Sequence, residues 1–507
     1  MTGPESNRSR FAAGDALATA GRRAGALVRA IPLALAIVVA AGVALRACMW
    51  LAYDPVMLNI ADTAPYVSMA DNTLFADSVR TAGYSMFLRV GHAFSTDLDV
   101  TLAIQHLLGI VTGLLAYATV RRAGAPVWAG VIAAAAVLLS LDQVLVEHTL
   151  ISEVVFSLLL VAGLYSGVRA LDEPSTIVGR VTSRHLWLVA AGALLAFSVW
   201  ARAVSAPLIP LLGIFFVFAL PGTAWVRLGR GALAAGAGAA VLLGYFALNS
   251  DTTGTFGLAR ATGWTLYSRA APFADCSQFT PPQGTRPLCE VTPIDERSGP
   301  DFYTWNEDSP ARMEFGYPPA NNEALGQFGR RAILASPRAY VSAVGRDTLR
   351  YFFPDINDEQ YLGGTPYEYL DIHRRDRDLE RDIQARLAVY YEPESLDVNE
   401  SLLDTLTDFQ QALRVHPILM LQALILGALG IWLGSGRVRA ALVLLLGTSL
   451  ILLVFPAAIG TYNVRYTIPI GGPLIGAGVI GLWVCIERLR GRQADAGAVE
   501  PHPAESI

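Results

Sequence analysis

Acidic and basic residues gather in residues 60–90, directly after the first long apolar segment of the chain. Asp62 and Arg80 lie in this stretch, and Tyr66 follows Asp62 at a spacing that places both on one face of a helix. A carboxylate can accept the proton of a hydroxyl nucleophile, and a guanidinium can bind phosphate through paired hydrogen bonds. These residue types could therefore support transfer of a group from a phosphate to a hydroxyl.

Polar residues also occur in further short segments at the ends of apolar runs. LDQVLVEHTLISEV contains His148 and Glu153, WARAVSAPLIP contains Arg202, and TYNVRYTIPIGGP contains Tyr462 and Arg465. Charged side chains at the ends of membrane spans are costly to place and often mark function. We expect these segments and residues 60–90 to meet at one end of a helical bundle.

Each charged candidate also has a structural interpretation. Asp62 is suited to cap the helix that follows it, and Glu153 lies in the first turn of a span, where an acid stabilises the helix dipole. Arg202 and Arg465 could extend toward lipid headgroups, and His148 is suited to a packed, hydrogen-bonded position. The sequence leaves these alternatives open.

The composition indicates an all-α polytopic membrane protein. The chain has 507 residues, 53% hydrophobic and 16% charged, whereas soluble domains carry about 25% charged residues. The net charge of −5 gives no indication of nucleic-acid binding. About ten apolar segments approach the length that spans a bilayer: 30–52, 101–119, 125–141, 152–170, 186–201, 204–220, 232–249, 416–434, 440–459 and 467–486.

Arginines cluster on every second connection between the apolar segments, as at residues 121–122, 169–184, 227–230 and 437–439. By the positive-inside rule these connections and both termini are cytoplasmic. The candidate residues then lie on the outer face of the cytoplasmic membrane. The expected organisation is a disordered cytoplasmic tail (1–28), a membrane module (29–250) with its first outer loop at 53–100, an extracytoplasmic loop with a small helical cap (251–415), C-terminal spans (416–487) and a second cytoplasmic tail (488–507), disordered from residue 491. The helical cap is expected from Asp371 to Val415.

The large outer loop carries two local patterns. Cys276 and Cys289 lie close together, and pairing in an oxidising compartment would stabilise the fold by about 3 kcal/mol, although two free thiols are the alternative. Residues 321–353 indicate one or two amphipathic helices, with a break at Pro337, on the membrane surface or in a packed soluble domain. The membrane-surface interpretation places Arg330, Arg331 and Arg338 at headgroups and Phe328, Ile333 and Leu334 toward the bilayer.

The order of the motifs resembles the GT-C superfamily of membrane glycosyltransferases. The matching features are Asp-x-x-x-Tyr from Asp62, Arg-Thr-Ala-Gly-Tyr-Ser-x-Phe-Leu from Arg80, Ile-Ser-Glu ending at Glu153, Ala-Arg ending at Arg202 and Val-Arg-Tyr around Arg465. The chain is similar to the polyprenyl-phosphate-sugar-dependent, protein-mannosyltransferase-like branch. The resemblance covers about residues 30–250, with a local match at residues 462–469.

This resemblance implies a seven-helix module with an interfacial first loop, followed by a variable outer loop and later spans. It implies a polyprenyl-phosphate-sugar donor, a glycan, lipid or protein acceptor, and chemistry at the outer face of the bilayer. By matching position, Asp62 would be the catalytic base and Glu153 a second acid that orients the acceptor. The substrate-binding candidates are Tyr66, Arg80, His148, Arg202, Tyr462 and Arg465.

Two departures from the family pattern concern metal binding. Many relatives carry paired acids in the first loop, whereas Asp62 is followed by Thr63, and the common Pro-Gly-Tyr-Pro is replaced by Ala-Gly-Tyr-Ser at residues 82–85. No His, Cys, Asp or Glu group has a convincing metal-ligand spacing either, so we expect no metal and no other cofactor.

Two other functional classes remain as alternatives. A lipid or glycan transporter of the cell envelope should place polar residues near the bilayer midplane, often in repeated halves. In this sequence the polar residues gather at the outer ends of the spans, and no repeat is visible. A non-catalytic assembly or receptor protein would not need acids and arginines from several separate segments.

Overall fold

Each apolar segment of the sequence forms a helix in the computed structural model, which describes residues 32–58, 62–178, 181–353, 387–393 and 395–497. Among these residues, seven helices are long and apolar enough to cross a membrane. They are α2 (Leu33–Ala52), α5 (Leu98–Arg122), α8 (Glu153–Ala170), α9 (Ser183–Ala201), α11 (Ala224–Thr253), α20 (Gly436–Ile459) and α21 (Thr467–Gly497), the last preceded by the short helix η7 (Val464–Tyr466). The chain is an all-α polytopic membrane protein, as the sequence predicts.

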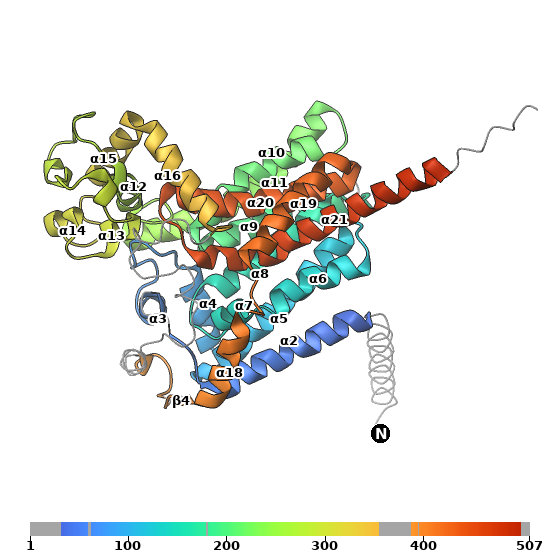
Figure 1. Cartoon of the computed structure of the whole chain (residues 1–507). Helices are drawn as coiled ribbons and strands as arrows, with labels where there is room; N and C mark the ends of the chain where they lie inside the picture. Colours follow the sequence, from blue (N-terminus) through green and yellow to red (C-terminus); the bar gives the residue numbers. More distant parts are fainter. Residues whose placement is uncertain (1–31, 59–61, 179–180, 354–386, 394, 498–507) are drawn as a thin grey trace, which may run out of the picture.

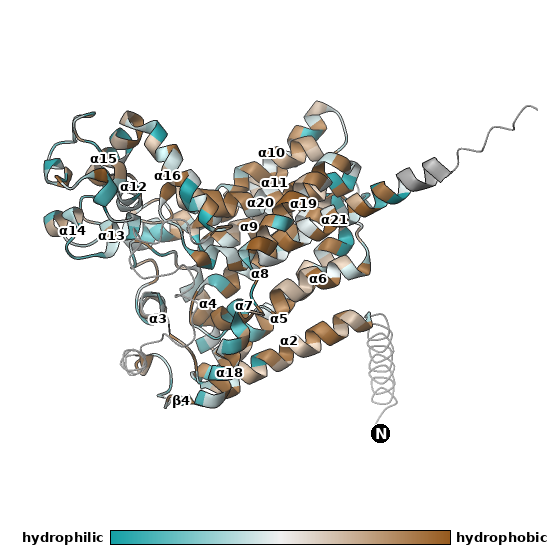
Figure 2. Cartoon of the chain, in the orientation of Figure 1, coloured by the Kyte–Doolittle hydropathy of each residue, from teal (hydrophilic) through white to brown (hydrophobic). Residues whose placement is uncertain are grey.

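The remaining apolar segments form bent or shorter helices. α6 (Val127–Leu138) and α7 (Leu141–Glu147) meet at 51° and together could make an eighth span. α10 (Leu208–Ala219), which follows the single turn η1 (Ala203–Ser205), and α19 (Pro417–Leu433) are shorter than the bilayer-spanning helices. In Figure 2 much of α9, α11, α20 and α21 is coloured brown, the colour of hydrophobic residues, as expected for helices that contact lipid or each other.

Small residues allow the spans to approach closely. A Cβ atom on Gly192 of α9 would lie 2.0 Å from the carbonyl oxygen of Ala234 in α11, so only glycine fits at this crossing. Close approach through small residues is a common basis of helix association in membranes. The glycine- and alanine-rich start of α11 therefore serves helix packing.

The part of the chain after α11 forms a small domain of short helices, which we call the outer domain (residues 254–353). It contains α12 (Thr262–Ala270), η2 (Ala271–Phe273), η3 (Arg286–Leu288), η4 (Ile294–Glu296), α13 (Pro300–Trp305), α14 (Pro310–Phe315), α15 (Asn322–Ala335) and α16 (Pro337–Arg350). It lies at one end of the bundle, whereas the start of α2 and the end of α21 lie at the opposite end (Figure 1). This arrangement agrees with the predicted topology, in which the start of the first span and the end of the last span lie on the same side of the membrane.

The outer domain has its own hydrophobic core. Trp264, Tyr267 and Phe328 are completely buried in it, and Phe328 contacts Tyr267 at 5.6 Å between ring centroids. The membrane-surface interpretation of residues 321–353 is therefore wrong for Phe328, because α15 turns this face toward α12 instead of the bilayer. Leu334, by contrast, is 79% exposed. Apolar helical spacing alone does not distinguish a lipid-facing stripe from a domain core.

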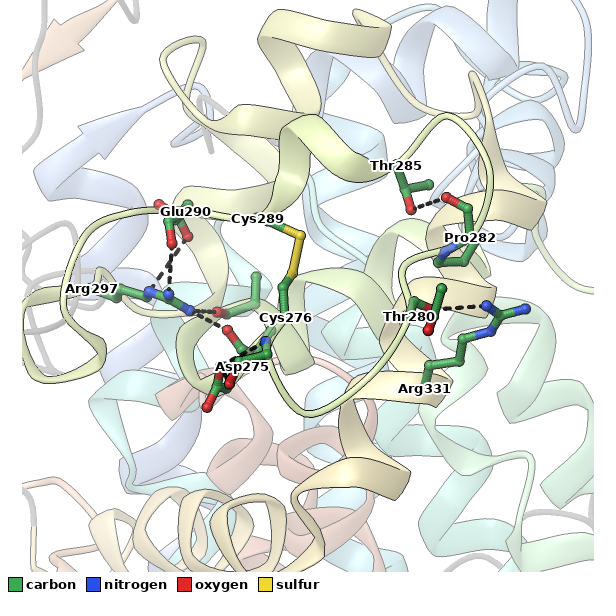
Figure 3. Close-up of a disulfide and its surroundings, with 12 residues drawn as sticks. Asp275, Cys276, Thr280, Pro282, Thr285, Cys289, Glu290, Arg297 and Arg331 are labelled. Atoms are coloured by element: carbon green, nitrogen blue, oxygen red, sulfur yellow. Dashed lines mark hydrogen bonds and ion pairs between the residues drawn. A yellow bond between two sulfur atoms is a disulfide. The ribbon is translucent and has the colours of Figure 1, made fainter.

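A disulfide joins Cys276 to Cys289 within the outer domain (Figure 3). Beside it, the Arg297 guanidinium donates hydrogen bonds to the backbone carbonyls of Ala271 and Ala274, at 3.1 and 2.7 Å. These contacts connect the loop that precedes α13 to η2, directly after α12.

The loop after α2, which the sequence predicts to be the first outer loop, contains α3 (Thr63–Asp71) and α4 (Gly83–His92). It begins with the short strand β1 (Tyr53–Asp54), which pairs antiparallel with β4 (Asp397–Val398), and β4 leads into α18 (Glu400–Gln410). A second short hairpin pairs β2 (Thr176–Val178) with β3 (Val181–Thr182).

The tail expected at 1–28 lies outside the described residues, as do residues 371–386 and 394 of the segment expected to form a helical cap, whereas the described part of that segment contains α18. At the other end, α21 continues to Gly497, so residues 491–497 are helical and the prediction of disorder is wrong for them.

Candidate active site

A cavity of about 570 Å³ lies between the membrane helices and the outer domain. Its walls come from α3 and the loop before α4, from the ends of α9 and α20, from η7, and from α12 and α13. The structure brings five of the predicted site residues to this cavity: Asp62, Tyr66, Arg80, Arg202 and Arg465. Segments separated by about 400 residues in the sequence thus meet, as Arg465 and Asp62 are 403 positions apart.

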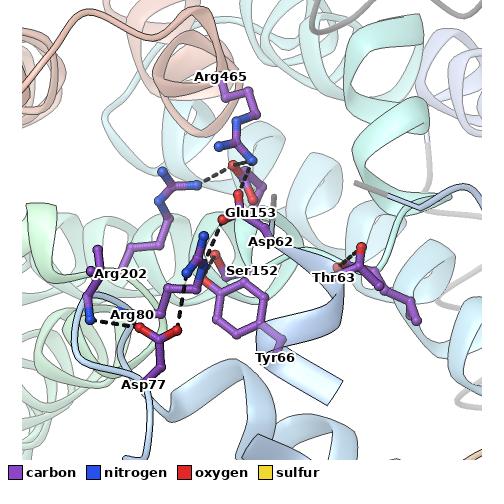
Figure 4. Close-up of polar contacts among 11 residues, drawn as sticks. Asp62, Thr63, Tyr66, Asp77, Arg80, Ser152, Glu153, Arg202 and Arg465 are labelled. Atoms are coloured by element: carbon purple, nitrogen blue, oxygen red, sulfur yellow. Dashed lines mark hydrogen bonds and ion pairs between the residues drawn. The ribbon is translucent and has the colours of Figure 1, made fainter. Parts of the chain in front are cut away.

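Asp62 lies between two arginines. One carboxylate oxygen, Oδ1, accepts a hydrogen bond from Arg80 Nε at 2.8 Å, and Oδ2 accepts one from Arg465 Nη1 at 2.6 Å (Figure 4). Asp62 precedes α3, but its side chain makes no capping hydrogen bond to that helix. The capping interpretation therefore does not account for its position, whereas the ion pairs do.

These two ion pairs determine the protonation of Asp62. Burial raises the pKa of its carboxyl, but the guanidiniums of Arg465 and Arg80 outweigh burial and hold the pKa well below its usual range. Asp62 is therefore ionised near neutral pH and has little affinity for a proton while both arginines contact it.

Glu153 is the first residue of α8 and lies behind the arginines. Its Oε1 atom forms ion pairs with Arg202 Nη1 and, at 3.4 Å, with Arg465 Nη1. The side chain is 1% exposed, and its Oε2 atom has no hydrogen-bond partner among the described residues. Glu153 is not among the residues that line the cavity, so it acts on the cavity through Arg202 and Arg465.

Two of the arginines also contact aromatic rings, and one of them, Arg80, binds the carboxylate of Asp77. The guanidinium of Arg202 lies 4.9 Å from the ring centroid of Tyr466, and that of Arg80 lies 5.8 Å from the ring of Trp305. Arg80 also donates from Nη1 to Asp77 at 3.2 Å. The three guanidiniums are thereby restrained at one side of the cavity.

Gly83 brings the segment that carries Arg80 close to Arg202. A Cβ atom on Gly83 would lie 2.4 Å from the backbone carbonyl of Trp200, at the end of α9, so any side chain here would separate the two segments. The adjacent Ala82 N–H donates to the hydroxyl of Tyr245 at 3.1 Å. The start of α4 is thus fixed against α9 and α11.

Tyr66 connects α3 to the start of α8. Its hydroxyl donates to Ser152 Oγ at 3.1 Å, and Thr63 donates to the carbonyl oxygen of Leu150 at 3.1 Å. These bonds join the element that carries Asp62 to the loop that precedes Glu153. The two predicted acids are therefore held at a fixed separation by buried hydrogen bonds.

His148 and Tyr462 are not brought to the cavity. His148 is completely buried, with Nε2 at 2.7 Å from the carbonyl oxygen of Tyr53 and Nδ1 at 3.1 Å from His106 Nε2. His106 in turn contacts Glu147 at 3.2 Å, and Glu147 forms a bidentate ion pair with Arg46. Tyr462 packs on Tyr351 at 4.6 Å between ring centroids. Both residues support the surrounding structure instead of the cavity surface.

Asp301 also lines the cavity, although no pattern in the sequence singles it out. Burial and the nearby carboxylate of Asp347 raise its pKa to about 6, against the lowering effects of a hydrogen bond from Thr461 and of Arg465. An acid after Gly-Pro is typical of a helix start. The local sequence therefore explains Asp301 as a helix-start residue and does not indicate that it lies at a cavity formed by distant segments.

No group of three or more His, Cys, Asp or Glu side chains within the described part of the chain could hold a metal ion. The two acids that the family pattern would suggest, Asp62 and Glu153, both direct an oxygen at Arg465. The described residues therefore fit an anion better than a cation.

No family model and no curated protein sequence matches the chain. Among solved structures, it is similar to the oligosaccharyltransferase of Archaeoglobus fulgidus tethered with an acceptor peptide, at 14% identity and a TM-score of 0.43 over 93% of this chain. It is also similar to ArnT from Cupriavidus metallidurans bound to undecaprenyl phosphate, at 13% identity and a TM-score of 0.35, covering 93% of this chain and 81% of that one.

The chain spans about half, 51%, of the length of the Archaeoglobus protein. Both neighbours are membrane glycosyltransferases of the GT-C superfamily, which is the superfamily that the sequence resembles.

Proposed function

We propose that the protein is a membrane glycosyltransferase that transfers a sugar from a polyprenyl-phosphate donor to a hydroxyl of a glycan, lipid or protein acceptor at the outer face of the membrane. The observation that carries this proposal is the convergence of Arg80, Arg202, Arg465 and Asp62 on one cavity at the end of the helical bundle. This set combines binding groups for a phosphate with a carboxylate that can accept a proton.

The arginines suit the change of charge in this reaction. A polyprenyl-phosphate sugar is a phosphodiester with one negative charge. As the bond between the anomeric carbon and the phosphate oxygen breaks, the leaving polyprenyl phosphate gains a second charge. Guanidiniums that are already fixed at the cavity wall stabilise this charge without reorganisation, which is the most effective form of electrostatic catalysis.

Asp62 takes the proton of the acceptor hydroxyl as that oxygen bonds to the anomeric carbon. In the free protein its proton affinity is low, because Arg80 and Arg465 occupy both oxygens. A bound phosphate competes for the same guanidiniums, and each one that turns to the phosphate raises the pKa of Asp62. Donor binding therefore raises the proton affinity of Asp62 and makes it a stronger base.

Glu153 was expected to orient the acceptor. Its contacts favour a positioning role instead, since it holds Arg202 and Arg465 from behind the cavity surface.

Binding of farnesyl phosphate to the purified full-length protein tests the proposal. Arg465→Gln should weaken binding about tenfold or more, because it removes a charge-assisted hydrogen bond. Arg439→Gln is the matched control, since Arg439 is an exposed arginine at the far end of α20. Wild-type protein that does not bind farnesyl phosphate, or equal binding by the two variants, would refute the proposed donor site.

A further inference from the structure

One face of α13 is directed into the cavity. Asp301, Thr304 and Trp305 all line it, and their spacing of three and four residues places them on the same side of a helix. α13 belongs to the outer domain, so this face reaches the cavity from a different part of the chain than the arginines do. None of the three residues belongs to the motifs that suggested a phosphate site.

The side chains of this face suit a sugar ring. A carboxyl and a threonine hydroxyl can exchange hydrogen bonds with ring hydroxyls, and an indole offers a flat apolar surface for the C–H face of the ring. Trp305 is 47% exposed, so much of its side chain is accessible to a ligand and is not packed in the core of the outer domain. Asp301 forms no ion pair with any described residue, in contrast to Asp62, whose oxygens are both held by arginines.

The position of Trp305 relates this face to the donor. Its ring lies 5.8 Å from the guanidinium carbon of Arg80, which contacts Asp62 in the phosphate-binding set. In a polyprenyl-phosphate sugar the anomeric carbon is bonded directly to a phosphate oxygen. A phosphate held by Arg80 therefore places the donor's sugar beside Trp305.

From this geometry we propose that the α13 face, Asp301, Thr304 and Trp305, is the binding subsite for the sugar ring of the donor and determines which sugar is accepted. The proposal rests on the proposed function, because it takes the arginines as the phosphate site. The ligand is a hydroxyl-bearing sugar attached to a prenyl phosphate. A site built to hydrogen-bond a hydroxyl rejects analogues that lack it far more strongly than an apolar pocket could.

The protonation of Asp301 adds a second signature. Its pKa of about 6 reflects burial, Asp347 and Arg465 around it, and the hydrogen bond from Thr461. Below that pH the carboxyl can donate a hydrogen bond, and above it the carboxylate only accepts. The contribution of the sugar to binding should therefore change between about pH 5 and pH 7, and this change should be lost in Asp301→Asn.

The test compares ligands with and without the sugar. Affinities of the purified full-length protein are measured for farnesyl phosphate and for farnesyl phosphate carrying glucose, mannose, galactose or arabinose. We expect wild-type protein to bind at least one sugar-bearing ligand tighter than farnesyl phosphate. Asp301→Asn and Trp305→Ala should each reduce that ratio about tenfold. Any change in phosphate binding that follows from loss of the contact between Trp305 and Arg80 affects both ligands and cancels in the ratio.

Matched controls are Asp308→Asn, an exposed acid on the loop after α13, and Trp225→Ala, an 83% exposed tryptophan at the start of α11. Trp305→Phe keeps an aromatic face and should retain most of the ratio, which guards against loss of fold in Trp305→Ala. Thermal unfolding of every variant is measured alongside.

The outcomes separate the two proposals. Absence of farnesyl phosphate binding by wild-type protein contradicts the proposed donor site itself. Farnesyl phosphate binding with no gain from any of the four sugars, or a gain that is equal in wild type, Asp301→Asn and Trp305→Ala, overturns the sugar subsite alone. The last of these results would also be seen if the α13 face held an acceptor glycan instead of the donor's sugar.

Discussion

Replacement of Asp62 by asparagine separates its proposed catalytic role from a structural one. The change keeps the size of the side chain and removes the negative charge. Because Asp62 makes no capping hydrogen bond to α3, no helix cap is lost. General-base assistance contributes about 10²- to 10⁴-fold, so the rate of sugar transfer from a farnesyl-phosphate donor should fall by that factor.

The same variant should bind farnesyl phosphate at least as tightly as wild type. In the free protein the carboxylate occupies Arg80 Nε and Arg465 Nη1, and a phosphate has to compete for them. The neutral amide of Asp62→Asn would remove one negative partner from Arg80 and one from Arg465, which keep Asp77 and Glu153 respectively, and this loss costs up to about 3 kcal/mol of folding stability. Farnesyl phosphate should restore this loss, so it should raise the Tm of Asp62→Asn more than that of wild type.

The assay therefore measures transfer rate, farnesyl phosphate affinity and Tm on the same preparations. Asp71→Asn, an exposed acid at the end of α3, is the control and should leave all three unchanged. Near-normal turnover of Asp62→Asn would exclude Asp62 as the base and leave Asp301 as the next acid in the cavity. A weaker affinity for farnesyl phosphate would contradict the exchange of arginines between Asp62 and the donor.

Three further predictions concern topology, packing and pH. In a Cys48→Ser, Cys485→Ser background, single cysteines at the exposed positions Ser175 and Ser435 should resist a membrane-impermeant thiol reagent in intact cells, whereas one at Glu307 should react; the reverse pattern would invert the orientation. Gly109→Ala should lower the free energy of unfolding by about 3 kcal/mol, because the added Cβ would lie 1.7 Å from Glu147 Oε1 and break the buried ion pair between Glu147 and Arg46. The control Gly236→Ala, where the Cβ meets open space, should leave stability unchanged. Equal Tm values for the two variants would contradict this packing. Ionisation of Asp301 is disfavoured in the fold, so wild type should lose stability relative to Asp301→Asn as pH rises from about 4 through 6, and a constant Tm difference would argue against the raised pKa.

The membrane helices and part of the site could be predicted from sequence because their signals are local. Apolar runs of bilayer length occur where the structure has helices, and Asp62 and Arg80 share one short loop. The convergence of Arg202 and Arg465 on the same cavity was predictable because both lie at the ends of spans. The length of an apolar span fixes how deep the residue at its end lies in the membrane. The sequence leaves undetermined only which other spans lie beside that residue.

Other features depend on contacts that no local pattern records. His148 lies five residues before Glu153, directly after α7, but its ring contacts His106 and does not line the cavity. Phe328 has the spacing of a lipid-facing residue, but α12 covers it. In both cases the partner of the residue lies in another part of the chain, and the local sequence around the residue does not identify it.

The charges of the cavity give the outer domain a separate part in the proposed function. Asp62 and Glu153 balance the charges of the arginines, so the proposed phosphate-binding side is stable without a ligand. In the proposed function, a donor that displaces Asp62 from the arginines is recognised there only by its phosphate, which is common to every polyprenyl-phosphate sugar. Any discrimination between sugars has to come from another wall, and α13 provides the wall that lies beside Arg80. Selection of the sugar and activation of the phosphate can then vary separately, because they depend on different segments of the chain.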